Sequence, residues 1–239
     1  MAILTAVTHR LADRYYYPAR LSRLARAVRR QNLTYLSHAK LATLERLIER
    51  VKRRRIPGDF LEFGVALGGS AILIAARLDG DRAFHGYDVF GMIPPPGDGD
   101  GADAHGRYAV IAAGQSGGIG GERYYGYRDD LYAEVTGSFA RFGLPVDQRR
   151  IALHRGLFAD TIRLDRAARV AFAHIDCDWY DPVRLCLDRI APHMPQGGIV
   201  VLDDYNDYGG CRRAVGEFLA RTPDFVLESA ANSAVLVRR

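Results

Sequence analysis

The chain has 239 residues, of which 48% are hydrophobic, and this favours one large α/β domain over two small ones. No apolar run reaches the roughly 18 residues that span a bilayer, and the start, MAILTAVTHRLADRYYY, lacks the apolar region of a secretory signal. The 3 cysteines form no CxxC pair, which argues against a disulfide framework or a zinc site. We therefore expect a cytoplasmic protein without a membrane partner.

The charge is distributed unevenly along the chain. Residues 1–55 hold 14 Lys/Arg and 3 Asp/Glu, a net charge of +11, and the remainder carries −6. Such a basic arm is one sign of nucleic-acid or membrane-surface binding. Leu21, Leu24 and Val28, however, are interspersed with arginines at helical spacing, which favours an ordinary amphipathic helix with a solvated basic face. Nucleic-acid binding is kept as the less favoured alternative.

Helices are predicted before residue 56. Residues 10–31 read as one or two basic amphipathic helices interrupted near Pro18. Residues 34–54 read as a stronger helix, with leucines at helical spacing, that ends at IPGD. We interpret residues 1–55 as an N-terminal helical extension that acts as a lid, and residues 56–239 as the main domain.

From residue 59, predicted strands and helices alternate. The strands are DFLEFGV, AFHGYDVF, RIALHRG, RVAFAHID and GGIVVLDDY, and FVLESA with SAVLVRR is expected to form a final hairpin. The helices between them are GGSAILIAARL, with Ser70 as its cap, then RDDLYAEVTGSFARF, DPVRLCLDRIAPHM and GCRRAVGEFLART. Alternation of this kind predicts a mostly parallel, doubly wound sheet with helices on both faces. The Pro- and Gly-rich residues 91–121 are expected to form a lid or substrate loop.

Ligands of such sheets bind beyond the carboxyl ends of the strands. Acidic residues gather at this edge, namely Glu62, Asp88, Asp176, Asp203 and Asp204. Their coincidence at one edge predicts a functional site there.

The first strand leads into a glycine-rich turn, EFGVALGGSA. Gly64 permits the turn, while Gly68 and Gly69 let a ligand approach backbone N–H groups. The turn is neither GxGxxG nor a P-loop, and a plain tight connection is the alternative. Asp88, at the end of the next strand, can accept hydrogen bonds from a ribose diol or cap a turn. Together these features favour an adenosyl ligand without a diphosphate, so S-adenosylmethionine more than NAD.

Three carboxylates, those of Asp176, Asp203 and Asp204, are expected at the tips of neighbouring strands. Their repulsion is unfavourable unless a cation joins them. Oxygen ligands suit Mg²⁺, with Mn²⁺ or Ca²⁺ as alternatives, and strand-end caps or arginine partners are the structural explanation. Asp178 is placed to take a proton from a metal-bound hydroxyl, or else caps a loop or helix.

Two further side chains in this stretch receive structural interpretations. Asp181, which precedes Pro182, is predicted to be a helix N-cap. His174 is predicted to be a buried histidine with its hydrogen bonds satisfied.

Several segments resemble the macrocin O-methyltransferase family, whose members are Mg²⁺- and S-adenosylmethionine-dependent enzymes that methylate sugar hydroxyls on natural products. The matching segments are IPGDFLEFGVALGGSA, YDVFGMIP, RFGL with ALHRGLFADT, AHIDCDWYDP and PQGGIVVLDDY. The resemblance covers roughly residues 34–94 and 128–220. Residues 95–127 do not match the pattern, and we expect them to meet the substrate.

The resemblance implies a class I methyltransferase fold with a sheet of about seven strands, and a homodimer or higher homo-oligomer. It implies that Asp176, Asp203 and Asp204 bind Mg²⁺ and that Asp178 is the general base. The residues predicted to bind the cofactor are Thr34, Tyr35, Leu36, Glu62, Gly64, Ser70, Asp88, Gly156, Phe158, Asp160 and Asp176. A catechol-type phenol remains the alternative to a sugar hydroxyl as the acceptor.

Overall fold

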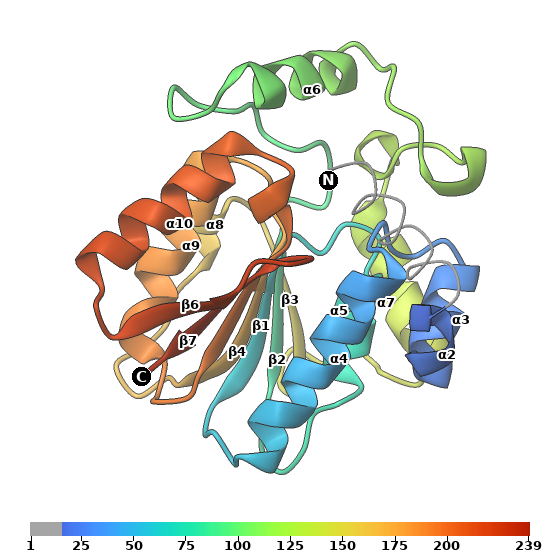
Figure 1. Cartoon of the computed structure of the whole chain (residues 1–239). Coiled ribbons are helices and arrows are strands. Elements are labelled where there is room, and N and C mark those ends of the chain that lie inside the picture. Colours follow the sequence, from blue (N-terminus) through green and yellow to red (C-terminus); the bar gives the residue numbers. More distant parts are fainter. Residues whose placement is uncertain (1–15) are drawn as a thin grey trace.

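The computed structural model describes residues 16–239. Its centre is a seven-stranded sheet in the order β3-β2-β1-β4-β5-β7-β6, which confirms the predicted fold class (Figure 1). The strands are β1 (Asp59–Phe63), β2 (Phe84–Asp88), β3 (Ile151–Arg155), β4 (Val170–Ile175), β5 (Ile199–Leu202), β6 (Phe225–Ser229) and β7 (Ala234–Arg238). Strands β1 to β5 pair in parallel, and β7 runs antiparallel to both β5 and β6. The final hairpin is thereby confirmed.

The strand order reverses at the β1–β4 pair, which lies near the middle of the sheet. Such a reversal opens a crevice beyond the carboxyl ends of the two strands, because their connections leave toward opposite faces. Gly64 follows β1 and Asp176 follows β4, so the topology brings the glycine turn and the first predicted metal ligand to one place.

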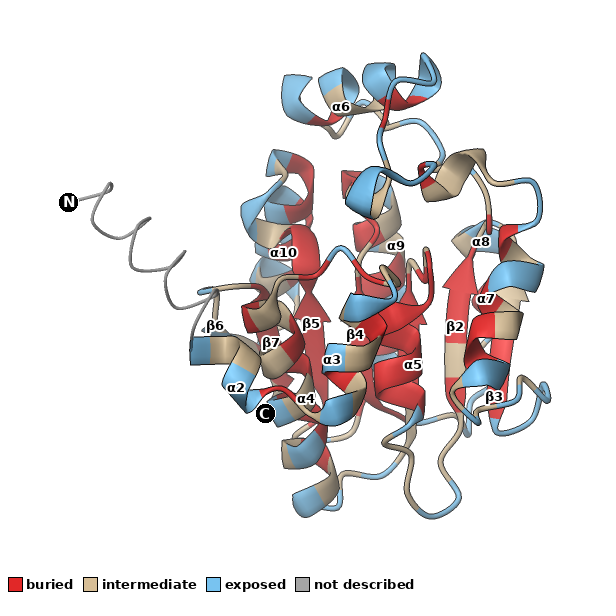
Figure 2. Cartoon of the chain, turned by 90° about the vertical axis from the view of Figure 1, so that its right-hand side faces the viewer, coloured by how far each residue is buried: buried red, intermediate tan, exposed pale blue. Residues whose placement is uncertain are grey.

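Helices cover both faces of the sheet (Figure 1). One face carries α3 (Arg23–Arg30), α4 (His38–Arg53), α5 (Gly69–Ala75) and α7 (Leu131–Arg141), with the short α2 (Tyr17–Arg20) at its border. The other carries α8 (Phe158–Thr161), α9 (Tyr180–Ile190), η4 (Ala191–His193) and α10 (Gly209–Arg221). The central strands β1, β4, β5 and β7 are almost entirely buried (Figure 2), which explains why they read as apolar runs, whereas the edge strand β6 is mostly half-buried or exposed.

The N-terminal helices pack into the same core as the sheet. In α4, Leu41, Leu44 and Leu47 are buried, as their helical spacing predicts, and Ala25 and Val28 of α3 are fully buried beside them. The arginines of α3 point outward or lie half-buried, so this helix is amphipathic in the ordinary sense. The division of the chain at residue 55 stays a prediction about organisation.

Two helix boundaries differ from the prediction. Pro18 lies in the first turn of α2, where proline is tolerated, and the chain breaks instead at Leu21 and Ser22, whose hydroxyl caps α3. Helix α4 begins at His38 rather than at Thr34, because the Ser37 hydroxyl accepts a hydrogen bond from the Lys40 N–H at a distance of 3.2 Å. Residues 34–36 are therefore irregular chain and not helix.

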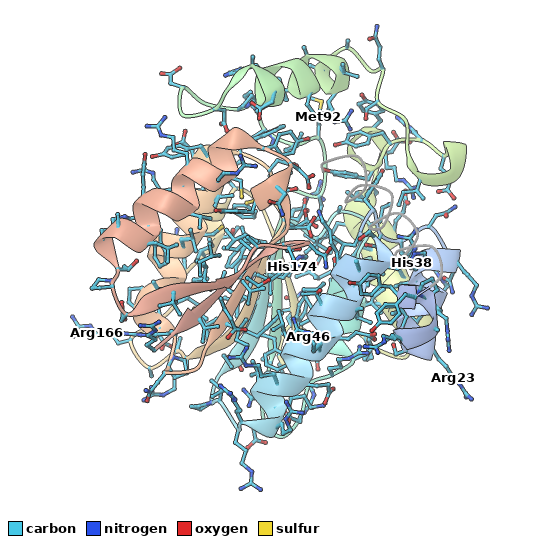
Figure 3. All side chains as sticks on the ribbon, in the orientation of Figure 1. Arg23, His38, Arg46, Met92, Arg166 and His174 are labelled. Atoms are coloured by element: carbon cyan, nitrogen blue, oxygen red, sulfur yellow. The ribbon has the colours of Figure 1, made fainter. Side chains whose placement is uncertain are left out.

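The Pro- and Gly-rich stretch is more ordered than a loop. It contains α6 (Ala102–Ala112) and the single turn η2 (Ile119–Gly121), and a further single turn, η3 (Tyr125–Tyr127), follows it. We call residues 91–127 the covering segment, because α6 lies beyond the carboxyl ends of the strands (Figure 1). Met92, 44% exposed, lies beneath α6 (Figure 3).

The covering segment is attached to the first turns of two helices. The Tyr180 N–H at the start of α9 donates to Asp100 Oδ1 at 2.8 Å, and the Gly209 N–H at the start of α10 donates to Asp103 Oδ2 at 2.9 Å. Carboxylates are stabilised at helix N-termini by unpaired N–H groups and by the helix dipole. These two contacts fix α6 over the edge of the sheet.

Within residues 16–239, no helix is both long enough and apolar enough to cross a membrane.

Candidate active site

A cavity of about 580 Å³ opens between the carboxyl ends of the central strands and the covering segment. Most of the predicted site residues line it, namely Thr34, Tyr35, Leu36, Gly64, Ser70, Asp88, Phe158, Asp176, Asp178, Asp203 and Asp204. Glu62, Gly156 and Asp160 are not among its lining residues, and their part in cofactor binding stays a prediction.

The glycine turn depends on the absence of side chains at two positions. Gly64 has a φ of +91°, and a Cβ atom there would lie 1.7 Å from the carbonyl oxygen of Asp176. A Cβ on Gly69 would lie 2.4 Å from the carbonyl oxygen of Leu33. The turn therefore touches both the end of β4 and the chain just before Thr34. Helix α5 starts at Gly69 after Gly68, so Ser70 is not the predicted cap but lies in the first turn, facing the cavity.

Gly64→Ala is expected to lower the melting temperature clearly and to weaken binding of S-adenosylhomocysteine. The added methyl group needs both a left-handed backbone and room that the Asp176 carbonyl occupies. Calorimetric unfolding and equilibrium binding measure the two effects. Gly106→Ala is the matched control, because its Cβ meets no atom within 4 Å; equal behaviour of the two variants would contradict the expectation.

The Asp88 carboxylate stabilises the glycine turn by accepting hydrogen bonds from its backbone. Its Oδ2 accepts the N–H groups of Val65 and Ala66 at 2.8 and 2.9 Å, and its Oδ1 accepts that of Phe90 at 2.6 Å. Burial raises the pKa of this carboxyl above its ordinary value, although the three N–H groups act in the opposite direction. Asp88 therefore caps the turn, which was the structural alternative for this residue. Since Asp88 also lines the cavity, binding of a ribose diol stays a prediction compatible with this arrangement.

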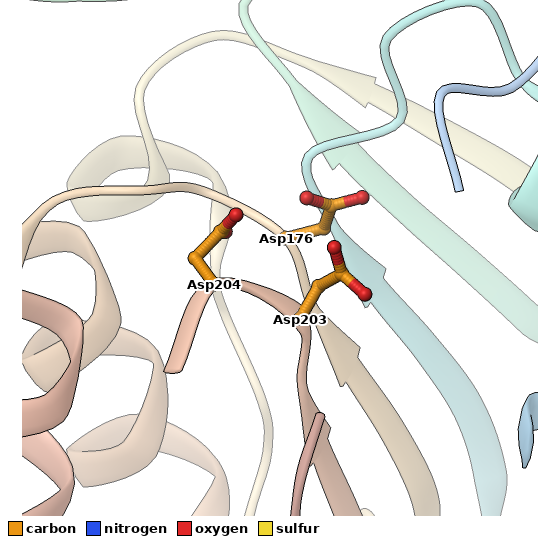
Figure 4. A group of neighbouring side chains, drawn as sticks. All are labelled: Asp176, Asp203 and Asp204. Atoms are coloured by element: carbon orange, nitrogen blue, oxygen red, sulfur yellow. The ribbon is translucent and has the colours of Figure 1, made fainter. Parts of the chain in front are cut away.

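The three predicted metal ligands converge at the ends of β4 and β5. Asp176, Asp203 and Asp204 each offer a carboxylate oxygen, and these atoms lie within 4.8 Å of one another (Figure 4). Burial, followed by mutual repulsion, raises the pKa values of Asp176 and Asp204 well above the ordinary range. An all-oxygen set of this size fits a hard divalent cation, which would remove the repulsion.

Lys40 is a site residue that the sequence analysis missed. Its ammonium group lies 2.7 Å from Asp203 Oδ2, 3.2 Å from the Asp203 carbonyl oxygen and 3.0 Å from Asp207 Oδ2. Burial lowers the pKa of Lys40, but the two carboxylates more than offset this, and the net shift is upward. Lys40 therefore stays charged and connects the first turn of α4 to the end of β5.

Asp178 faces the cavity from the loop between β4 and α9. Its φ of 60° is unusual for a residue other than glycine, and its N–H donates to Asp204 Oδ2 at 3.0 Å. Burial and the repulsion by Asp203 raise the pKa of its carboxyl to about 7, although Arg107 and Lys40 lower it. A carboxylate with such a pKa beside an acidic cluster is suited to accept a proton near neutral pH.

The predicted N-cap of α9 is wrong. The helix begins at Tyr180 and its N-cap is Trp179, so Asp181 lies one residue inside the first turn and is mostly exposed. An aspartate in this position interacts favourably with the helix dipole without capping it. Pro182 is in the first turn, as expected.

His174 and Glu62 form a fully buried pair on adjacent strands. His174 Nδ1 lies 2.8 Å from Glu62 Oε1, and neither side chain is exposed. Figure 3 shows His174 inside the sheet layer. The predicted burial of His174 is confirmed. Its hydrogen bonds are only partly satisfied, because Glu62 Oε2 and His174 Nε2 have no hydrogen-bond partner among the described residues.

The comparison with known protein families matches residues 8–224 to TylF, the macrocin O-methyltransferases. The chain belongs to this family. It is 30% identical over 192 residues to the 8-demethyl-8-(2,3-dimethoxy-alpha-L-rhamnosyl)-tetracenomycin-C 4'-O-methyltransferase of Streptomyces olivaceus, covering 79% of this chain and 68% of the relative. It is 31% identical over 195 residues to the mycinamicin III 3''-O-methyltransferase of Micromonospora griseorubida, covering 79% and 70%.

A solved structure shares the fold of this macrocin O-methyltransferase. The O-methyltransferase NovP superposes with a TM-score of 0.71 at 24% identity, covering 87% of this chain and 82% of that one. Family membership identifies the protein as an S-adenosylmethionine-dependent O-methyltransferase, which confirms the enzyme class and the cofactor expected from the sequence.

Proposed function

We propose that the protein is a Mg²⁺-dependent enzyme that transfers a methyl group from S-adenosylmethionine to a sugar hydroxyl of a natural product. The observation that carries the metal dependence is the convergence of Asp176, Asp203 and Asp204 in the cavity that also holds the glycine turn. The sugar acceptor is supported by relatives, one of which is named as the 4'-O-methyltransferase of a rhamnosyl-tetracenomycin.

The cavity residues would have different roles in binding the metal and the cofactor. Asp176, Asp203 and Asp204 would hold the metal, while the Gly64 turn, Asp88 and residues 34–36 would bind the cofactor. The cofactor supplies an electrophilic methyl group, and the metal supplies positive charge beside the acceptor oxygens.

Asp178 would accept the proton of the acceptor hydroxyl as its oxygen attacks the methyl group, which it can do from its place on the cavity wall. The covering segment would exclude water from the reacting groups. The chain then contributes chiefly orientation and electrostatic stabilisation.

An acceptor panel tests this function directly. Purified protein with S-adenosylmethionine is expected to methylate rhamnosides carrying a vicinal diol in the presence of Mg²⁺, and to lose at least about 100-fold in rate with EDTA. Mass spectrometry of the products gives the readout. Turnover of catechols but not of sugars would replace the acceptor class with the phenol alternative, and rates insensitive to EDTA would reject the metal dependence.

The N-terminal residues bear on two further proposals. The basic helix α3 has an ordinary buried side, as an amphipathic helix of a globular protein should, and this favours a structural role over nucleic-acid binding. Residues 10–15 of the predicted first helix lie outside the described residues. The homodimer, the cytoplasmic location and a lid function of residues 1–55 stay predictions.

A further inference from the structure

Arg107 is the cation that α6 presents to the cavity. Helix α6 is attached at its start by Asp103, and the Tyr127 hydroxyl donates to the Ile111 carbonyl oxygen near its end at 2.6 Å. Because both ends are held, the guanidinium group is placed by the fold and not by a free loop.

The charge of Arg107 has no acidic partner within residues 16–239. Its Nη2 donates to the Ser116 hydroxyl at 2.8 Å, and its guanidinium carbon lies 5.9 Å from the centre of the Tyr124 ring. No ion pair joins it to a carboxylate of the described chain, whereas Lys40, the other lysine or arginine lining the cavity, is held by Asp203 and Asp207. A guanidinium has five N–H donors, and one bond to a hydroxyl leaves most of them free for a ligand.

Arg107 and Asp178 face the same space without touching. Both side chains line the one cavity, yet among the described residues no ion pair joins them. The Tyr124 ring lies beside Arg107, and the cavity carries the apolar side chains of Ile111 and Pro94 as well as its carboxylates. An ion pair formed in such surroundings is stronger than one in water, because the local dielectric constant is lower.

We propose that Arg107 is a specificity-determining residue that binds an anionic oxyacid group of the acceptor. The acceptor is then a sugar that carries a phosphate or a carboxylate, with its reacting hydroxyl at Asp178 and its anion at Arg107. This inference rests on the proposed sugar O-methyltransferase function and narrows its substrate class. The two sources of the anion are a nucleoside diphosphate sugar and a sugar acid.

Equilibrium binding separates these sources. The wild-type protein, saturated with S-adenosylhomocysteine and Mg²⁺, is titrated calorimetrically with thymidine diphosphate rhamnose, with methyl glucuronide and with neutral methyl rhamnoside. One anionic probe is expected to bind at least about 10-fold more tightly than the neutral one. Arg107→Met should remove this difference, and Arg107→Lys should restore part of it, because lysine keeps the charge but not the planar fork.

Arg123→Met is the matched control, because Arg123 lies in the same covering segment, is 57% exposed and pairs with Asp129. It should bind all probes like the wild type. Equal binding of charged and neutral probes by the wild type, or a uniform loss for all probes in Arg107→Met, would overturn the proposal. Methyl transfer is measured separately, so tight anion binding without metal-dependent methylation would reject the proposed function and leave the anion site standing.

Discussion

Asp203→Ala is expected to weaken Mn²⁺ binding by more than about 100-fold and to lower metal-dependent methyl transfer by at least as much. Mutation of residues that only hydrogen-bond to metal ligands typically costs about 10- to 100-fold in metal affinity, so loss of a ligand itself should cost more. The variant removes one of three carboxylate oxygens that lie within 4.8 Å of one another. Electron paramagnetic resonance of bound Mn²⁺ reports binding without reference to activity.

Asp207→Ala is the control for this experiment. Asp207 also pairs with Lys40 and also lines the cavity, but it does not belong to the three-carboxylate cluster. If the two variants lose Mn²⁺ to the same extent, general negative charge and not ligation attracts the metal. If Asp203→Ala keeps full affinity and full activity, the three-carboxylate site is not the metal site.

The sheet could be predicted because its strands are buried on both faces. All six residues of β4 are buried, so the apolar run VAFAHI predicts a strand from the local sequence alone. The acidic residues that follow β4 and β5 could be placed at one edge by the rule for parallel sheets alone. The fold class and the acidic cluster were therefore accessible from the sequence.

Contacts made across long stretches of chain were not accessible in the same way. Lys40 reaches Asp203 over a separation of 163 residues, and only the packing of α4 on the sheet brings them together. Glu62 was assigned to the cofactor by the resemblance to the family, and that assignment stays a prediction. Its buried pairing with His174 on the adjacent strand is another long-range contact that no local pattern reports.

Helix α6 shows why the covering segment read as a loop. Its surroundings are rich in glycine and proline, it has no side-chain cap, and only Ala104 and Ile111 are buried. The signals that mark a helix in a sequence are weak here. The helix is held by tertiary contacts, among them the bond from Gly209 to Asp103, and no local pattern reports those.

Asp178→Asn is expected to lower kcat by about 10²- to 10⁴-fold, the range typical of a lost general base, while S-adenosylhomocysteine binding changes little. The amide has nearly the shape of the carboxylate but cannot take up the proton. In the wild type, kcat should rise with pH through the pKa of Asp178, which is about 7 before any metal charge lowers it. The variant should lack this rise. Stopped assays across pH 5 to about 9, with cofactor saturating, measure both effects.

Stability gives a second readout that does not depend on turnover. The pKa of Asp178 is raised from 3.8 to about 7 by folding, so between these values the folded protein binds more protons than the unfolded one. Its contribution to the free energy of unfolding therefore falls as pH rises through this window. The melting temperature of the metal-free wild type should decrease from pH 4 to about 7 more steeply than that of Asp178→Asn.

Asp181→Asn provides the matched control for both readouts. Asp181 is on the same short stretch of chain and also lines the cavity, but its side chain is mostly exposed, pairs with Arg184 at 3.9 Å and does not belong to the acidic cluster. It should keep the activity and the pH profile of the wild type. If Asp178→Asn retains wild-type kcat at every pH, Asp178 is not the base, and proton removal must be assigned to another group of the cavity.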